Sequence, residues 1–152
     1  MQVDVNELIR KIKVFISLQT YTRDIRCKYV LEDIPPIEIS AFHLEQAMLN
    51  IINNSFEAMG SGGTLTIKTF LTKDSATPLI AIEISDTGSG IDLPETSADR
   101  VQKPRRQGRG FGLFIADEII KSYGGNLKIR GEHGKGTTVS FLLPIDTKKD
   151  GN

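Results

Sequence analysis

The spacing of apolar residues predicts three amphipathic helices, over residues 5–18, 41–59 and 110–123. Asp4 or Asn6 is the expected N-cap of the first helix, and a serine stands directly before the second. Glycines follow the second and third helices, as is typical of helix C-termini.

Five further segments are rich in Ile, Val and Thr or alternate apolar with polar residues. They predict strands over residues 26–31, 64–71, 79–85, 126–130 and 137–143. We expect residues 131–136 to form a hairpin loop and residues 86–107 an irregular loop. Hairpins beside long helices, without strict strand–helix–strand alternation, predict an α/β fold. The expected form is a two-layer α/β sandwich with a mixed, mostly antiparallel sheet, and not a Rossmann fold.

Composition is typical of an ordinary globular domain. Of the 152 residues, 39% are hydrophobic and 25% are charged, which excludes a disordered or fibrous chain. Nineteen basic residues balance nineteen acidic ones, so no global field favours nucleic acid or an anionic membrane, although local clusters are left open. Cys27 is the single cysteine, and no apolar stretch is long enough to span a bilayer. We therefore expect a cytoplasmic domain, or a piece of a larger cytoplasmic chain.

The helix over residues 41–59 has a polar side of unusual composition. On a helical wheel, six polar residues fall within a wedge of about 100°. They are His43, Gln46, Asn50, Asn53, Asn54 and Glu57. A solvated side would normally carry Lys, Glu and Gln, whereas each Asn costs about 0.5 kcal/mol or more relative to Ala. Amide oxygens suit a hydrated Mg²⁺ beside phosphates. We therefore assign a functional role to Asn50 and Asn54, and leave His43 and Gln46 as surface residues.

Two glycine-containing motifs follow. Asp86-Thr-Gly-Ser-Gly-Ile91 comes after a strand and is either a tight turn or a site where the carboxylate accepts a hydrogen bond from a ligand amino group. Gly108-Arg-Gly-Phe-Gly-Leu113 opens a helix, although each glycine there costs about 1 kcal/mol. Bared N–H groups at a helix N-terminus are a ready phosphate site. This motif is neither a Walker A motif nor G-x-G-x-x-G.

The loop before the second glycine motif is basic, with no acidic residue after Asp99. Its cations are Arg100, Lys103, Arg105, Arg106 and Arg109. They form either solvated surface or a loop that closes over anionic phosphates.

Three motifs follow one another in this order: an Asn-rich helix, D-x-G-x-G after a strand, and G-x-G-x-G at a helix start. The three together are far more specific than any one of them. Together they resemble the N, G1 and G2 boxes of the catalytic ATP-binding domain of bacterial sensor histidine kinases. That domain belongs to the GHKL superfamily, shared with DNA gyrase, heat-shock chaperone ATPases and mismatch-repair ATPases. The similarity runs from Val3 to Pro144. It implies a Bergerat-type fold, a catalytic domain over residues 1–146 and a polar tail over residues 147–152.

The resemblance implies a role for each motif residue. Asn54 is expected to ligate Mg²⁺, with Asn50 near the metal and phosphates. Asp86 is expected to bind the adenine amino group, in a base pocket shaped by Gly88, Gly90 and Ile91. The other expected ATP contacts are Glu57, Gly108, Arg109, Gly110, Phe111, Gly112, Leu113 and Thr137.

Position 50 separates relatives within the superfamily. In its ATPases, a glutamate at this place acts as general base on water, whereas the Asn50 amide cannot take up a proton at neutral pH. The resemblance therefore implies phosphoryl transfer to a nucleophile positioned by another domain, with little hydrolysis.

Two features of complete kinases are not found in this sequence. Between Ile91 and Phe111 there is no aromatic residue, so no Phe-rich F box is recognisable. Neither His43 nor His133 begins an acceptor-like helix. We therefore expect the chain to bind ATP and Mg²⁺ without phosphorylating itself.

The leading hypothesis is the ATP-donating domain of a two-component histidine kinase. Its expected partners are a dimerisation and histidine phosphotransfer domain of the same parent protein and a response regulator downstream. We expect no nucleic-acid partner and no direct membrane insertion, while the parent protein can be membrane-anchored. Two alternatives stay open: a serine kinase of the anti-sigma type, and a non-catalytic interaction module on the same fold.

Overall fold

A computed structural model describes residues 2–60, 62–73, 76–88, 109–132 and 134–145. Its main sheet has the strand order β2-β4-β5-β7-β6, in which β2 runs parallel to β4 and the other neighbours are antiparallel. The strands are β2 (Ile25–Leu31), β4 (Gly63–Leu71), β5 (Leu79–Asp86), β6 (Asn126–Glu132) and β7 (Gly136–Pro144).

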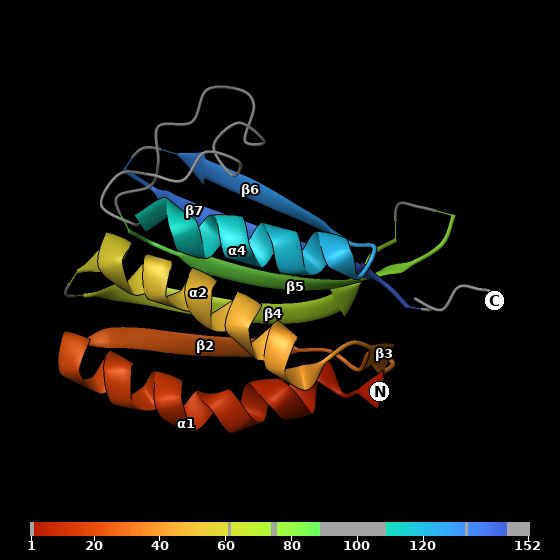
Figure 1. Cartoon of the computed structure of the whole chain (residues 1–152). Helices are drawn as coiled ribbons and strands as arrows, with labels where there is room; N and C mark the ends of the chain where they lie inside the picture. Colours follow the sequence, from red (N-terminus) through yellow and green to blue (C-terminus); the bar gives the residue numbers. More distant parts are fainter. Residues whose placement is uncertain (1, 61, 74–75, 89–108, 133, 146–152) are drawn as a thin grey trace.

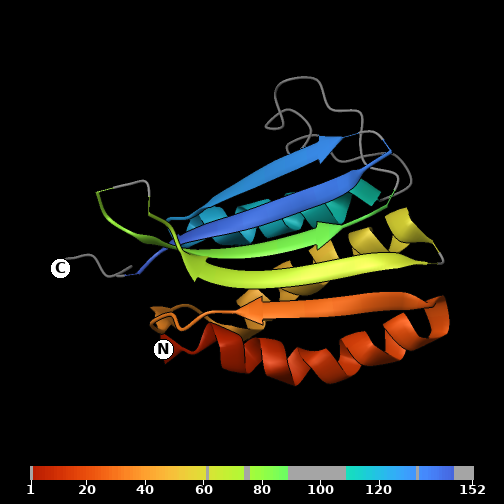
Figure 2. The ribbon, with the colours of Figure 1, turned by 180° about the vertical axis from the view of Figure 1, so that it is seen from behind.

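Among the described residues, three helices form the second layer: α1 (Val5–Arg23), α2 (Ala41–Met59) and α4 (Arg109–Ser122). In Figure 1, α2 and α4 lie in front of the sheet and α1 lies alongside its edge strand β2; from behind, the strands lie in front of α2 and α4 (Figure 2). The predicted two-layer α/β sandwich with a mixed, mostly antiparallel sheet is thereby confirmed. Among the described residues, no helix is both long enough and apolar enough to cross a membrane.

The ends of several elements differ from their predictions. Helix α1 continues to Arg23, and Asp4 caps it by accepting a hydrogen bond from the Glu7 amide at 3.1 Å. Strand β5 includes Asp86, so this residue ends a strand instead of beginning a loop. Strands β6 and β7 extend into the predicted 131–136 loop because their ladder continues to the pair Glu132–Gly136. The rest of the predicted long loop, residues 89–107, and the tail over 147–152 lie outside the described residues.

A second, two-stranded sheet escaped prediction. It pairs β1 (Gln2–Val3) with β3 (Ile37–Glu38) in antiparallel register. Strands of two residues carry too little alternation to be recognised from sequence.

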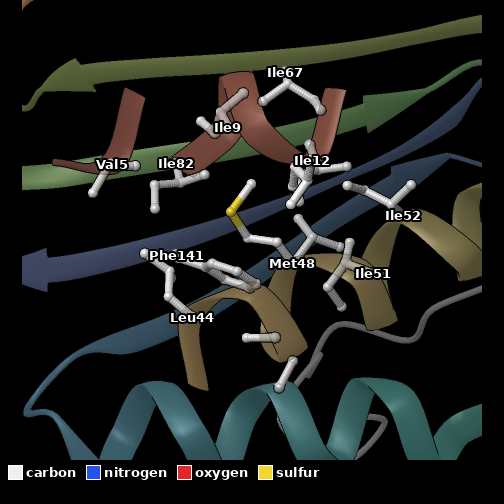
Figure 3. Close-up of a cluster of buried hydrophobic side chains, with 14 of the residues drawn as sticks. Val5, Ile9, Ile12, Leu44, Met48, Ile51, Ile52, Ile67, Ile82 and Phe141 are labelled. Atoms are coloured by element: carbon white, nitrogen blue, oxygen red, sulfur yellow. The ribbon is translucent and has the colours of Figure 1, made fainter. Parts of the chain in front are cut away.

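The core lies between the helices and the sheet. In Figure 3, Met48 of α2 lies among Ile9 and Ile12 of α1 and Ile82 and Phe141 of the sheet, all of them buried. Two aromatic residues that the helical patterns placed on apolar sides are exposed instead: Phe15 at 41% and Phe42 at 66%. Both lie at the margins of their apolar sides on a helical wheel, where a side chain need not reach the core.

Asn6, a candidate cap by sequence, instead joins α1 to the sheet from a buried position. Its Nδ2 donates to the Glu32 carbonyl at 2.8 Å, and its Oδ1 accepts from the Thr69 hydroxyl at 2.7 Å. Because buried polar groups need partners, this amide holds the first turn of α1 on β4 and on the end of β2.

Replacing Asn6 with Ala is expected to lower the free energy of unfolding by about 1–3 kcal/mol, because the Thr69 hydroxyl and the Glu32 carbonyl lose their partner. Urea denaturation measures the change. Asn53→Ala is the matched control, since Asn53 is exposed on α2 and its loss should change stability by no more than about 0.5 kcal/mol. Equal stability of the two variants would contradict this role of Asn6.

Candidate functional site

Helices α2 and α4 lie side by side (Figure 1). Two asparagine side chains of α2 lie next to Gly112 of α4. Asn50 and Asn54 are half-buried one turn apart on α2. A Cβ atom at Gly112 of α4 would lie 3.4 Å from the Asn50 Cβ and 3.6 Å from the Asn54 Oδ1. The bare backbone at Gly112 therefore brings the first turns of α4 next to both amides. Asn53 and Glu57, from the same polar wedge, are exposed.

Asp86 is the last residue of β5 and is only 8% exposed. Its Oδ1 accepts a hydrogen bond from the Gly88 amide at 2.9 Å, which fixes the orientation of the carboxylate. Thr137 of β7, half-buried, is its partner in the antiparallel ladder. The structure therefore places the first residue of the D-x-G motif beside Thr137, another expected ATP contact.

Two close backbone approaches enclose Asp86. A Cβ atom at Gly88 would lie 2.8 Å from the carbonyl carbon and oxygen of Ala58, in the last turn of α2. A Cβ atom at Gly136 would collide with the Asp86 carbonyl oxygen, and Gly136 has a φ of +114°. Both positions therefore require glycine. The contribution of Ala58 and Gly136 was missed from sequence, where Gly136 counted only as a loop glycine.

Thr87, the variable residue of the D-x-G motif, anchors the motif to the next strand. Its hydroxyl accepts a hydrogen bond from the Thr64 amide at 3.0 Å, and its oxygen lies 4.0 Å from the Met59 sulfur. Sequence reasoning missed this residue, because a hydroxyl at a variable motif position carries no signal of its own.

Helix α4 begins at Arg109, with Gly110 and Gly112 in its first turns. A helix N-terminus carries unpaired amides and the positive end of the helix dipole, so this end of α4 can hold an anion beside Asn50 and Asn54. Leu113 packs against the core. Of the other predicted site residues, Gly90, Ile91 and Gly108 lie outside the described residues, as do the loop cations at 100–106.

The site residues form two groups, Asp86 with Gly88 and Asn50 with Asn54. Both groups lie along α2, because Ala58, which contacts Gly88, follows Asn54 by one helical turn. A buried carboxylate therefore lies near one end of a surface that carries amide oxygens and a helix N-terminus further along. In the part of the chain that the structure describes, no three or more His, Cys, Asp or Glu side chains gather to hold a metal ion. Oxygen donors for a metal here are the amides of Asn50 and Asn54.

His43 lies at the other end of α2. Its Nδ1 is 2.6 Å from the Tyr123 hydroxyl, which also accepts from the Ser40 amide at 3.3 Å. Along a helix, the fifteen residues from His43 to Ala58 span about 22 Å. The structure therefore separates His43 from the Asp86 carboxylate, and the seven residues between His43 and Asn50 span about 10 Å.

Comparison with known proteins shows which class of protein this chain resembles. The family model described as histidine kinase-, DNA gyrase B- and HSP90-like ATPase matches residues 40–147. Sensor histidine kinase ZraS of Escherichia coli (strain K12) is 28% identical over 154 residues, spanning 97% of this chain and 32% of ZraS. Sporulation kinase C of Bacillus subtilis (strain 168) is 38% identical over 106 residues, spanning 67% of this chain and 23% of that kinase. The chain therefore covers about a third or less of these relatives.

Solved structures of similar fold are also histidine kinases. The nucleotide-free catalytic domain of ThkA matches with a TM-score of 0.80 at 22% identity, covering 97% of this chain and 96% of that domain. Full-length ShkA in complex with AMPPNP gives 0.79 at 22% identity over 95% of this chain and 30% of ShkA. ThkA in complex with the response regulator TrrA gives 0.80 at 22% identity over 99% of this chain and 43% of the matched chain.

Since the family model covers more than half of the residues, the chain belongs to the family of histidine kinase-, DNA gyrase B- and HSP90-like ATPases. The resemblance drawn from the three sequence motifs is confirmed.

The packing around the two motif glycines predicts a graded response to added methyl groups. Gly88→Ala is expected to lower the free energy of unfolding by about 1–3 kcal/mol, because the new Cβ overlaps the Ala58 backbone. Gly112→Ala should cost less, because its Cβ would make ordinary contacts and alanine favours the helix by about 1 kcal/mol. Urea denaturation of both variants tests the order. The reverse order would contradict the close approach at Gly88.

Proposed function

We propose that this chain is the ATP-binding catalytic domain of a sensor histidine kinase, working in the cytoplasm and donating the γ-phosphoryl group of ATP to a histidine on a separate domain. One observation carries the proposal: helix α2 contacts both parts of the site. Its Ala58 backbone packs against Gly88, whose amide holds the Asp86 carboxylate, and its Asn54 side chain lies next to Gly112 of α4. Family membership and the kinase relatives support it.

Adenine would bind at the Asp86 end of the site. The carboxylate accepts a hydrogen bond from the adenine amino group, and its tie to the Gly88 amide holds it ready for that contact. Thr137, the partner of Asp86 on the neighbouring strand, would lie next to the base. In this assignment, Gly88, Gly90 and Ile91 shape the pocket walls.

The phosphates would lie toward the N-terminus of α4. Amides of the segment with Gly108, Gly110 and Gly112 donate to phosphate oxygens, and the positive end of the helix dipole adds to the attraction. The remaining proposed ATP contacts are Glu57, Arg109, Phe111 and Leu113. ShkA, a protein of this fold, has been solved in complex with AMPPNP, and this supports a nucleotide as the ligand.

Mg²⁺ fits the donors present. It prefers oxygen ligands and keeps several waters, so one or two amide oxygens beside phosphates suffice for it. Asn54, whose Oδ1 faces Gly112, would be the direct ligand, with Asn50 beside it. When bound, the ion neutralises charge on the transferring phosphoryl group.

The proposed chemistry follows from the lack of a general base at position 50. An amide cannot take a proton from water, so Asn50 orients and does not act as a base. The attacking nucleophile would come from a dimerisation and histidine phosphotransfer domain, and the phosphoryl group would pass on to a response regulator. The structure of ThkA with the response regulator TrrA supports such a partner. Since the chain spans about a third or less of the relatives named, both partners belong to the proposal.

Calorimetric titration with ATP, with and without Mg²⁺, tests the nucleotide site. We expect a dissociation constant of about 1 μM to 1 mM. Asp86→Asn should weaken binding of ATP in either condition, whereas Asn54→Ala should remove only the gain from Mg²⁺. Asn53→Ala is the matched control for the second variant, since Asn53 is exposed one residue away. Absence of binding by the folded chain would overturn the proposal and favour a non-catalytic interaction module.

Incubation with γ-labelled ATP tests whether the chain alone transfers the γ-phosphoryl group to itself or to water. We expect the chain alone to gain no labelled histidine and to release phosphate only slowly, because Asn50 is no general base and His43 is remote from the site. Thin-layer chromatography follows phosphate release and acid-labile label on the protein. Label that disappears in His43→Gln would contradict the proposed donor role.

A further inference from the structure

Helix α1 is apolar on two opposite sides. Its inner side is buried in the core, where Ile12 and Ile16 lie. Val14, Leu18 and Tyr21, here named the α1 stripe, are exposed at 69%, 66% and 89% and lie on the opposite side of the helix. A surface helix that needs no partner presents a polar outer side, so the α1 stripe points to a partner.

Exposed large apolar side chains are concentrated on this helix. Seven such side chains are exposed in the part of the chain that the structure describes, and four of them belong to α1. The fourth on α1 is Phe15, beside the stripe, while Val30, Phe42 and Ile115 are spread over β2, α2 and α4. Clustered exposed apolar groups mark interaction sites, whereas single ones are ordinary.

The basic residues of α1 do not form one positive surface. The Arg10 guanidinium lies 3.4 Å from the Glu7 carboxylate. The Lys13 amine lies over an aromatic ring of β2, and Arg23 donates to a backbone carbonyl of α2 at 3.3 Å. Because the outer side thus carries Glu7, Arg10 and Lys11 beside the stripe, it suits apolar contact with a protein better than a polyanion or an anionic lipid surface.

The α1 stripe is complementary to itself when a second α1 runs antiparallel to it. Val14 and Tyr21 stand equally far along the helix from the point between Ser17 and Leu18. A twofold rotation about that point sets Val14 against Tyr21 of the second copy, a small side chain against a large one, and brings the two Leu18 side chains together.

Charge favours the same antiparallel arrangement. Lys11 and Asp24 are both exposed and stand equally far from the point that relates Val14 to Tyr21. In the antiparallel pair, Lys11 of each copy lies toward Asp24 of the other, whereas a parallel pair would bring Lys11 toward Lys11. Size and charge therefore share one centre of symmetry.

A second copy has access to the stripe. In Figures 1 and 2, α1 lies at one edge of the molecule beyond β2, and no other labelled helix or strand lies on its far side. Strands β5 and β7, which carry Asp86 and Thr137, are separated from β2 by β4. Contact through the stripe therefore leaves this end of the candidate site free.

We propose that two copies of this chain associate through an antiparallel pair of α1 helices, with the twofold axis at the point between Ser17 and Leu18. The stripe from Val14 to Tyr21 is only about 12 Å long. The association is therefore weak, with a dissociation constant of about 10 μM to 1 mM. The proposal does not depend on ATP binding.

Sedimentation velocity over about 10 μM to 1 mM chain measures the association. The parent chain should pass from monomer to dimer over this range. Leu18→Asp and Leu18→Lys should each raise the dissociation constant by at least about tenfold, because like charges then meet at the twofold axis. An equimolar mixture of the two variants should dimerise at least about tenfold more tightly than either alone, because opposite charges then meet.

Val14→Asp and Tyr21→Lys test the direction of the helices. Each variant alone should weaken the dimer. With both changes in one chain, opposite charges meet across an antiparallel pair, and the dimer should be tighter than that of either single variant. In a parallel pair like charges would meet, so a double variant weaker than both single variants would contradict the proposal.

Phe42→Asp is the matched control, because Phe42 is as exposed as Leu18 but lies on α2. Its dissociation constant should equal that of the parent chain, and circular dichroism establishes that every variant is folded. A parent chain that stays monomeric at about 1 mM overturns the proposal. So does a mixture of the two Leu18 variants that associates no better than each alone, or an equal loss in Phe42→Asp.

Discussion

The closeness of α2 to its neighbours on two sides is the constraint on which the candidate site depends. Toward the core, its buried residues are apolar except for Ser55. Toward α4, Asn50 and Asn54 approach a bare glycine, and in its last turn the Ala58 backbone meets Gly88 with no room for a methyl group. Because the D-x-G motif packs directly against α2, the Asp86 carboxylate at the end of β5 is held in a fixed position relative to the amide oxygens on that helix. Precise placement of this kind is what a site that works by positioning requires.

The sequence pattern predicted the helices, the five main strands and the fold class, since each long element has a clear period. Its errors fall where the period is weak. Phe42 was placed with the apolar half of α2, but a residue at the margin of a helical face can lie on either side of the boundary. Asn6 read equally well as a cap, and only its contacts with Glu32 and Thr69 show it to be a buried link.

The candidate site was predicted from three motifs in order, and the packing behind them was not. The structure brings Asp86 to Thr137 and the asparagines to Gly112, while their roles toward ATP stay predictions. The parts that sequence could not show are backbone contacts, because a carbonyl group is the same at every residue.

The central claim is that one ligand lies across both groups of residues along α2. The most direct measurement is the change in backbone amide NMR shifts when ATP and Mg²⁺ are added to the ¹⁵N-labelled chain. The account predicts large changes at Gly88, Asn54, Gly112 and Thr137, and small ones at Tyr123 near the other end of α2. Changes gathered around Tyr123, or at only one of the two groups, would contradict it.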